Sequence, residues 1–129
     1  MIQRVQTVYL VFSILICFLT FYLFPLELEK KDFFGINFPF FFQKYSFISI
    51  SIISLISIIL YNKRNFQILL NRFSMLLIFL IIISFFVYSN YINDYKIIIS
   101  AFINLILIIL ANKSILKDKK LIDSINRLR

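Results

Sequence analysis

Four long apolar stretches, each free of charged residues, dominate the pattern of the chain. They cover about residues 5–24, 45–61, 73–89 and 97–112, and short polar segments separate them. An α-helix needs about 20 apolar residues to cross about 30 Å of hydrocarbon, with a tolerated range near 17–25. The fourth stretch is the shortest, so its flanking polar residues must complete the crossing by reaching to the headgroups. The pattern predicts an all-α membrane protein, a single domain that forms a bundle of four transmembrane helices.

The first apolar stretch has a second interpretation, a cleavable signal peptide. Such a peptide has an apolar core of about 7–15 residues followed by a cleavage site of small residues. Here the apolar run is longer, and Pro25 closes it without such a site. We therefore expect a retained helix.

Two of the connecting segments are distinctive. Residues 26–44 form a short external loop that mixes charges with phenylalanines, and Gly35 and Pro39 are expected to break any long helix there. Residues 62–72 form a basic link between the second and third stretches. The phenylalanines of the loop are expected to lie at the headgroup boundary, with a patch that binds a partner as the alternative.

The tail, residues 113–129, has a different character. Leu121, Ile122, Ile125 and Leu128 recur at spacings that place them on one face of a helix, and basic residues occupy the remainder. This spacing predicts a basic amphipathic helix that either lies on the membrane surface or continues the fourth span.

The composition excludes a soluble globular enzyme. Of the 129 residues, 61% are hydrophobic and 16% are charged, whereas an ordinary soluble domain is about 45–50% apolar and about 25% charged. A chain this small exposes a large share of its surface, so it could not hide so much Ile, Leu and Phe from water. The surrounding solvent must be lipid.

The distribution of charge predicts the orientation. Four crossings place both chain ends and the 62–72 link on one side, which holds ten of the 14 Lys and Arg residues and two carboxylates, and thus the whole net charge of +8. Short basic segments resist translocation, so this side is predicted to face the cytoplasm, with the protein in the inner membrane. The basic residues are expected to contact anionic lipids of the inner leaflet. Nucleic acid is not expected as a partner, although ribosomal RNA or an acidic protein is the alternative for the tail. The predicted headgroup contacts are Lys63, Arg64, Arg72, Lys117, Lys119, Lys120, Arg127 and Arg129.

The chemistry available inside the membrane is narrow. The chain has no histidine and a single cysteine, Cys17, so it has neither the commonest metal ligand nor a CxxC redox pair. Charged residues inside a membrane mark proton relays and ion paths, and their absence from the four stretches argues against an exporter that uses an embedded glutamate. We expect no enzyme activity, no cofactor and no metal. A membrane enzyme that uses the loop carboxylates of Glu27, Glu29 and Asp32 is the weakest alternative.

Polar residues within the stretches form two groups. The second stretch carries serines within about 140° of one another on a helix, which predicts a seam against a neighbouring helix. Asn104 lies near the centre of the fourth stretch, with Ser100 one turn before it, and we expect it to hydrogen-bond to another helix rather than to a substrate. The predicted packing residues are Ser46, Ser49, Ser54, Ser57, Ser100 and Asn104.

The two ends of the chain carry more specific sequence. The chain opens with MIQRVQTVYL, ends with LANKSILKDKKLIDSINRLR, and has a YNKR motif directly after the second stretch. In these motifs it resembles a family of small Bacteroidota membrane proteins, domain of unknown function 4293, and its phenylalanine-rich loop departs most from the family pattern. The resemblance implies a four-helix integral inner-membrane protein of a Gram-negative bacterium. It carries no established activity.

The end motifs also predict a rim at the cytoplasmic side, where side chains of the first and fourth helices hydrogen-bond to one another. The rim residues are Gln3, Arg4, Gln6, Asn112 and Lys113. We expect the protein to be a non-enzymatic accessory or scaffold subunit of an inner-membrane assembly, with a membrane protein as partner. The alternative is a small transporter or lipid-binding protein that uses the region of Ser100 and Asn104. That alternative needs a polar, water-accessible cavity at mid-depth.

Overall fold

The computed structural model describes residues 2–23, 38–87 and 95–127, and this part of the chain is built of four α-helices. The helices are α1 (Ile2–Leu23), α2 (Phe38–Ile59), α3 (Arg64–Val87) and α4 (Tyr95–Arg127). All four are long and apolar enough to cross a membrane, and the described residues contain no strand. The predicted all-α fold with four membrane-spanning helices is confirmed.

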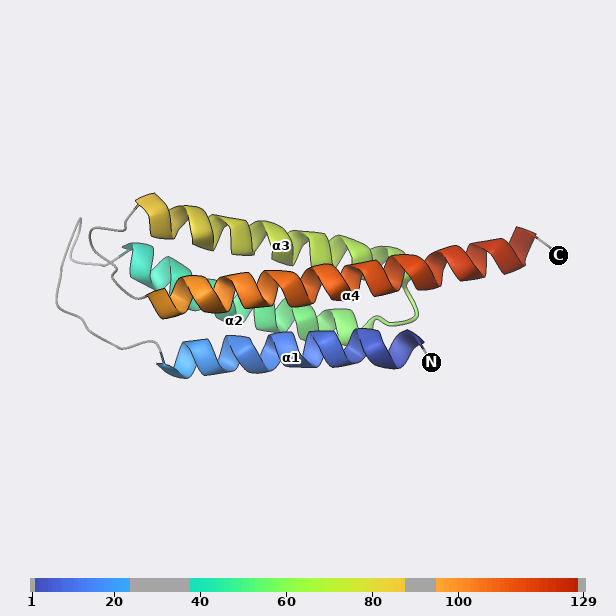
Figure 1. The fold of residues 1–129 in the computed structure, drawn as a ribbon, viewed down its shortest axis with the longest axis horizontal. Helices are drawn as coiled ribbons and strands as arrows, with labels where there is room; N and C mark the ends of the chain where they lie inside the picture. Colours follow the sequence, from blue (N-terminus) through green and yellow to red (C-terminus); the bar gives the residue numbers. More distant parts are fainter. Residues whose placement is uncertain (1, 24–37, 88–94, 128–129) are drawn as a thin grey trace.

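The helices form an antiparallel bundle in which both chain ends lie at the same end (Figure 1). Each helix packs against two neighbours: α1 lies against α2 and α4, and α3 lies against the same two helices from the other side. We call the end that holds residues 60–63 and the last turns of α4 the basic end of the bundle.

The buried positions of each helix alternate spacings of three and four residues. This period of 3.5 residues is the heptad repeat of helices that pack in a left-handed bundle. On α3 the series is Gln67, Asn71, Ser74, Ile78, Ile81 and Phe85, and on α4 it is Ile97, Ala101, Asn104, Ile108, Ala111 and Ile115.

Large apolar side chains also cover the outside of the bundle. Phe12, Leu76 and Ile83 are each more than half exposed, although they lie in the middle of their helices. Water would penalise such a surface, whereas hydrocarbon solvates it. Because both faces of each helix are apolar, packing rather than hydrophobicity decides which face turns inward.

α2 and α3 begin well before the apolar stretches that predict them. α2 begins at Phe38, so Pro39, expected to break a helix, instead occupies the first turn, where its missing N–H costs no hydrogen bond. α3 begins at Arg64, so most of the predicted 62–72 link is helical. It remains helical because Gln67 and Asn71 are buried against α2. The rest of the external loop, including Gly35, lies outside the described residues.

The tail continues the fourth span. α4 is a single helix of 33 residues, about 50 Å long at 1.5 Å per residue, and it projects beyond the other three helices (Figure 1). We call residues 119–127, the part beyond Asp118, the α4 extension. The sequence predicts that the tail either lies on the membrane surface or continues the fourth span, and in the structure it continues the fourth span.

Candidate functional site

The middle of the bundle is closed by hydrogen bonds between α1 and α4. Asn104 is fully buried and accepts a hydrogen bond from Ser13 Oγ at 2.5 Å, while its Nδ2 donates to Cys17 Sγ at 2.8 Å. Ser100 Oγ donates to the carbonyl of Ile97 in its own helix. Both ends of the Asn104 amide are thus engaged by α1, and Ser100 makes only a local bond among the described contacts.

The serines of α2 divide between local and interhelical hydrogen bonds. Ser46 and Ser49 donate to carbonyls of their own helix, at Phe42 and Ser46 respectively. Ser57 is fully buried, and its Oγ donates to Asn71 Oδ1 of α3 at 3.1 Å. Ser46 and Ser54 are also buried, whereas Ser49 is half-buried. Of the four predicted seam serines, only Ser57 has an interhelical hydrogen bond among the described contacts.

Buried polar residues occur along the whole interior of the bundle and are most numerous in its basic half. At the opposite end Gln43 is fully buried, and its Nε2 donates to Ser84 Oγ of α3 at 3.0 Å. Gln67 Nε2 donates to the carbonyl of Ser57 at 2.6 Å, and Asn71 Nδ2 is buried without a hydrogen-bond partner among the described residues. Toward the opposite end the core consists mainly of large apolar side chains. The buried polar residues of the basic half are Gln6, Ser54, Ser57, Gln67, Asn71 and Ser74, and the apolar core includes Phe47, Ile50, Ile78, Ile81, Phe85 and Ile97.

Several of these polar residues escape sequence reasoning. Four of the buried polar residues are not among the predicted packing residues: Ser13, Gln67, Asn71 and Ser74. Two of them, Gln67 and Asn71, lie in the segment that the sequence indicates to be a link. A signal was nevertheless present. Extending the heptad spacing backward from Ile78 reaches each of the three residues on α3 in turn.

The predicted rim between α1 and α4 is only partly described. The side chains of Gln3 and Arg4 lie outside the described residues. Gln6 is buried, Lys113 is exposed, and Asn112 is half-buried with its Oδ1 unpartnered among the described residues. The proposed hydrogen bonds across this rim stay a prediction.

An ion pair joins α3 to α4 at the basic end. Arg64 Nη2 lies 3.1 Å from Asp118 Oδ2, and the two side chains are only 20% and 15% exposed. The second terminal nitrogen of Arg64, Nη1, is buried and has no hydrogen-bond partner in the described structure. One half of the guanidinium is therefore paired with Asp118, and the other half has no acceptor among the described residues.

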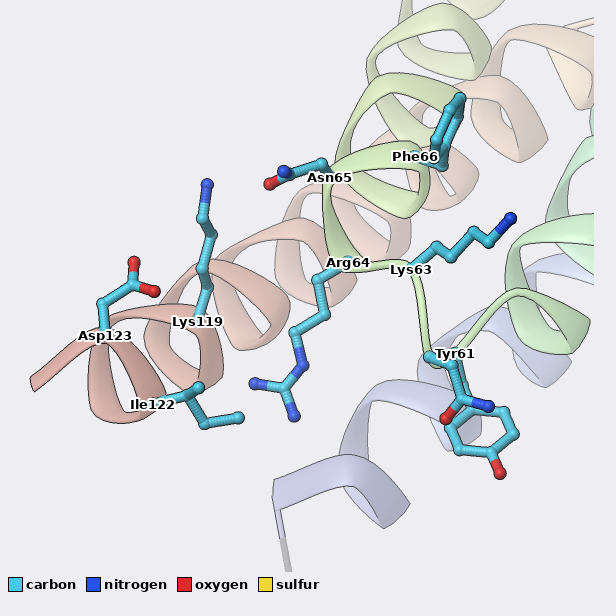
Figure 2. A pocket seen from close by; sticks show the side chains of 9 residues that line it. Tyr61, Lys63, Arg64, Asn65, Phe66, Lys119, Ile122 and Asp123 are labelled. Carbon is cyan, nitrogen blue, oxygen red and sulfur yellow. The ribbon is translucent and has the colours of Figure 1, made fainter. Parts of the chain in front are cut away.

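Beside this ion pair lies a pocket of about 510 Å³. Residues 61–66 line one side, and Lys119, Ile122 and Asp123 of the α4 extension line the other. Figure 2 shows Arg64 reaching from the start of α3 into the space between these walls, with Lys63 and Lys119 at the edges. The lining contributes three cations and one carboxylate. The pocket is therefore suited to an anion.

The predicted headgroup contacts fall into three sets. Lys63, Arg64 and Lys119 line the pocket, and the side chain of Arg127 and the whole of Arg129 lie outside the described residues. The exposed remainder is Arg72, Lys117 and Lys120. Among the described residues no group of three or more His, Cys, Asp or Glu could hold a metal ion.

Comparison with known proteins gives one finding. The family model described as "Domain of unknown function (DUF4293)" matches residues 2–128. No curated protein and no solved structure matches the chain.

Proposed function

The chain belongs to the DUF4293 family, and from this premise we propose that it is a non-enzymatic accessory or scaffold subunit of an inner-membrane assembly. In this proposal the protein crosses the bacterial inner membrane four times, and the basic end of the bundle faces the cytoplasm. The family description assigns no activity, so the proposal rests on the shape and chemistry of the bundle itself.

The distribution of charge supports the orientation. Of the residues near the basic end, Lys63, Arg64, Lys117, Lys119 and Lys120 are cationic, and short basic segments are retained in the cytoplasm. Each Lys or Arg close to an anionic leaflet adds about 1 kcal/mol of attraction. We propose anionic inner-leaflet lipids as the partner of this basic surface.

The α4 extension is the observation that carries the subunit proposal. It projects beyond the other helices, and Leu121, Ile122 and Ile125 are 46%, 40% and 59% exposed on it. Because α4 continues from the bundle as one uninterrupted helix, we expect these apolar side chains to leave the hydrocarbon with the helix instead of lying along the membrane surface. An apolar helix face held out of the lipid is suited to a partner helix.

The interior favours the subunit over the transporter alternative. A transporter that uses Ser100 and Asn104 needs polar groups available to a substrate at mid-depth. Asn104 is instead fully buried, with its amide engaged by Ser13 and Cys17. The buried side chains there pack one helix against another.

Photo-cross-linking in native membranes tests the proposal. A photoreactive residue at Ile125, on the α4 extension, is expected to give a discrete protein adduct that is reproducible between preparations. The matched control is Leu76, which is as exposed as Ile125 but lies in the middle of α3, and it is expected to label lipid alone. If both positions label only lipid under every growth condition, the subunit proposal is wrong.

A further inference from the structure

The pocket at the basic end combines an unused hydrogen-bond donor with a surplus of positive charge. Arg64 gives Nη2 to Asp118 and keeps Nη1 buried and unpartnered among the described residues. We propose that this pocket binds the phosphate of an anionic membrane phospholipid, with Arg64 as the residue that donates to a phosphate oxygen. This inference rests on the lipid contact proposed above and narrows it from a diffuse surface to a single site.

The chemistry of Arg64 favours phosphate. A guanidinium presents its N–H donors in a fixed planar fork that matches the oxygens of carboxylate and phosphate. Asp118 Oδ2 already pairs with one terminal nitrogen of the guanidinium, Nη2, at 3.1 Å. The low exposure of the pair, 20% and 15%, reduces screening by water, which strengthens a hydrogen bond from the guanidinium to an anionic acceptor. The Asp118 carboxylate offsets part of this attraction, and the other cations of the pocket add to it. The ion pair thus orients Arg64 and leaves its other terminal nitrogen, Nη1, without an acceptor among the described residues until a ligand binds.

The rest of the pocket adds positive potential at its edges. Figure 2 shows Lys63 and Lys119 extending from opposite walls, away from the guanidinium. Lys63 Nζ lies 5.9 Å from the centre of the Phe66 ring. The first turn of α3 also begins here, and the first N–H groups of a helix have no acceptors within it. These groups attract an anion to the pocket, while Asp123 limits the net charge of the lining.

The walls of the pocket indicate that the phosphate belongs to a lipid. Tyr61 and Phe66, which line the pocket beside Arg64, are 54% and 57% exposed. These side chains lie where α2 ends and the membrane-spanning part of α3 begins, which is the depth at which aromatic residues meet headgroups. A phosphate that enters beside Arg64 therefore has apolar surface next to it for the glycerol and the first acyl carbons. A free phosphate ion would leave that surface unused.

Native mass spectrometry of the full chain tests the site. The protein is released from nanodiscs and titrated with phosphatidylglycerol or with phosphatidylcholine, whose choline cancels the phosphate charge. We expect one retained phosphatidylglycerol per chain and weaker retention of phosphatidylcholine. Arg64→Gln should weaken phosphatidylglycerol binding about tenfold, as expected for loss of a charged hydrogen bond. Arg64→Lys should weaken it as well, because an ammonium lacks the fork.

Arg72→Gln is the matched control. It removes the same charge from the same helix at an exposed position outside the pocket. Because Arg72 belongs to the predicted headgroup contacts, a small loss of general attraction is expected, and binding should weaken far less than with Arg64→Gln. Circular dichroism and gel filtration of each variant confirm that the bundle is folded.

Three results would overturn the site. Equal weakening by Arg64→Gln and Arg72→Gln would mean diffuse attraction, which removes the pocket and leaves the lipid contact of the basic surface standing. Equal binding of the two lipids would remove both proposals. Inorganic phosphate that binds alone at millimolar concentration and displaces the lipid would show a soluble ligand instead. If phosphatidylglycerol vesicles displace the retained lipid from the protein and inorganic phosphate does not, the lipid proposal is supported.

Discussion

Asn104 shows how one polar residue fixes the packing of two helices in an apolar solvent. Its Oδ1 accepts from Ser13, and its Nδ2 donates to Cys17, so three side chains at the same depth fit only in one register of α1 against α4. Ser100, one turn away, bonds within its own helix. Two polar side chains on the same face of α4 thus have different roles, one between helices and one within a helix.

Substitution of these two residues separates the roles. Asn104→Ala should lower the free energy of unfolding in detergent by about 1–2 kcal/mol, because it removes two interhelical hydrogen bonds and leaves a small void. Ser100→Ala should change it by less than about 0.5 kcal/mol. Steric trapping or an SDS titration measures both. A larger effect of Ser100→Ala than of Asn104→Ala would contradict this account.

At the scale of an element, α3 shows why the inward face of a membrane helix is hard to recognise. Ile78 is fully buried and Phe79, the next residue, is 53% exposed, yet both are large and apolar. In water the exposed side would be polar, whereas in lipid both sides are apolar. The inward face is marked instead by Gln67, Asn71 and Ser74, which belong to the same series of buried positions, spaced by three and four residues, as Ile78.

The neighbouring pair on α3 gives a prediction that depends on this face. Ile78→Ala should lower the free energy of unfolding by about 1–3 kcal/mol, because it leaves a cavity between packed helices. The cost is below that in a soluble core since lipid is as apolar as the side chain removed. Phe79→Ala should have little effect because lipid fills the space. Equal losses at the two positions, measured by the same unfolding assay, would argue against the register of α3.

The position of α3 also shows the limit of prediction from the sequence. The four apolar stretches were predictable because a bilayer requires length and freedom from charge. The start of α3 was not, because Gln67 and Asn71 look like link residues until Ser57 on α2 supplies their partner atoms. The pocket depends likewise on Arg64 and Asp118, which no local pattern connects. The apolar stretches of single helices could therefore be predicted from the sequence, whereas the side-chain contacts between helices could be found only from the fold.

At the scale of the whole molecule, the bundle is asymmetric from end to end. Both chain ends, the α2–α3 link and the α4 extension gather at one end (Figure 1). Most of the buried polar residues lie in that same half, among them Gln6 and Asn71, whereas the other half is mainly apolar around Phe47 and contains the Gln43–Ser84 hydrogen bond. We propose that the more polar and more basic end faces the cytoplasmic leaflet.

Thiol labelling tests which leaflet that is. In a Cys17→Ala background, Ser124→Cys on the exposed surface of the α4 extension should react with a membrane-impermeant maleimide only from the cytoplasmic side. Tyr95→Cys, at the opposite end of the same helix and 71% exposed, should react only from the periplasmic side. Sealed vesicles of both orientations give the comparison. Labelling of Ser124→Cys from the periplasmic side and of Tyr95→Cys from the cytoplasmic side would contradict the proposed orientation.

The unbroken course of α4 has a mechanical consequence. Tyr95 and Ile125 belong to one helix without an interruption, so they are the two ends of a stiff rod about 45 Å long. Buried residues from Ile97 to Ile115 pack this rod against α1 and α3, and the Arg64–Asp118 pair joins it to α3 once more at the basic end. Any tilt of α4 within the bundle would therefore carry the α4 extension with it, and the tip of the extension would move farthest.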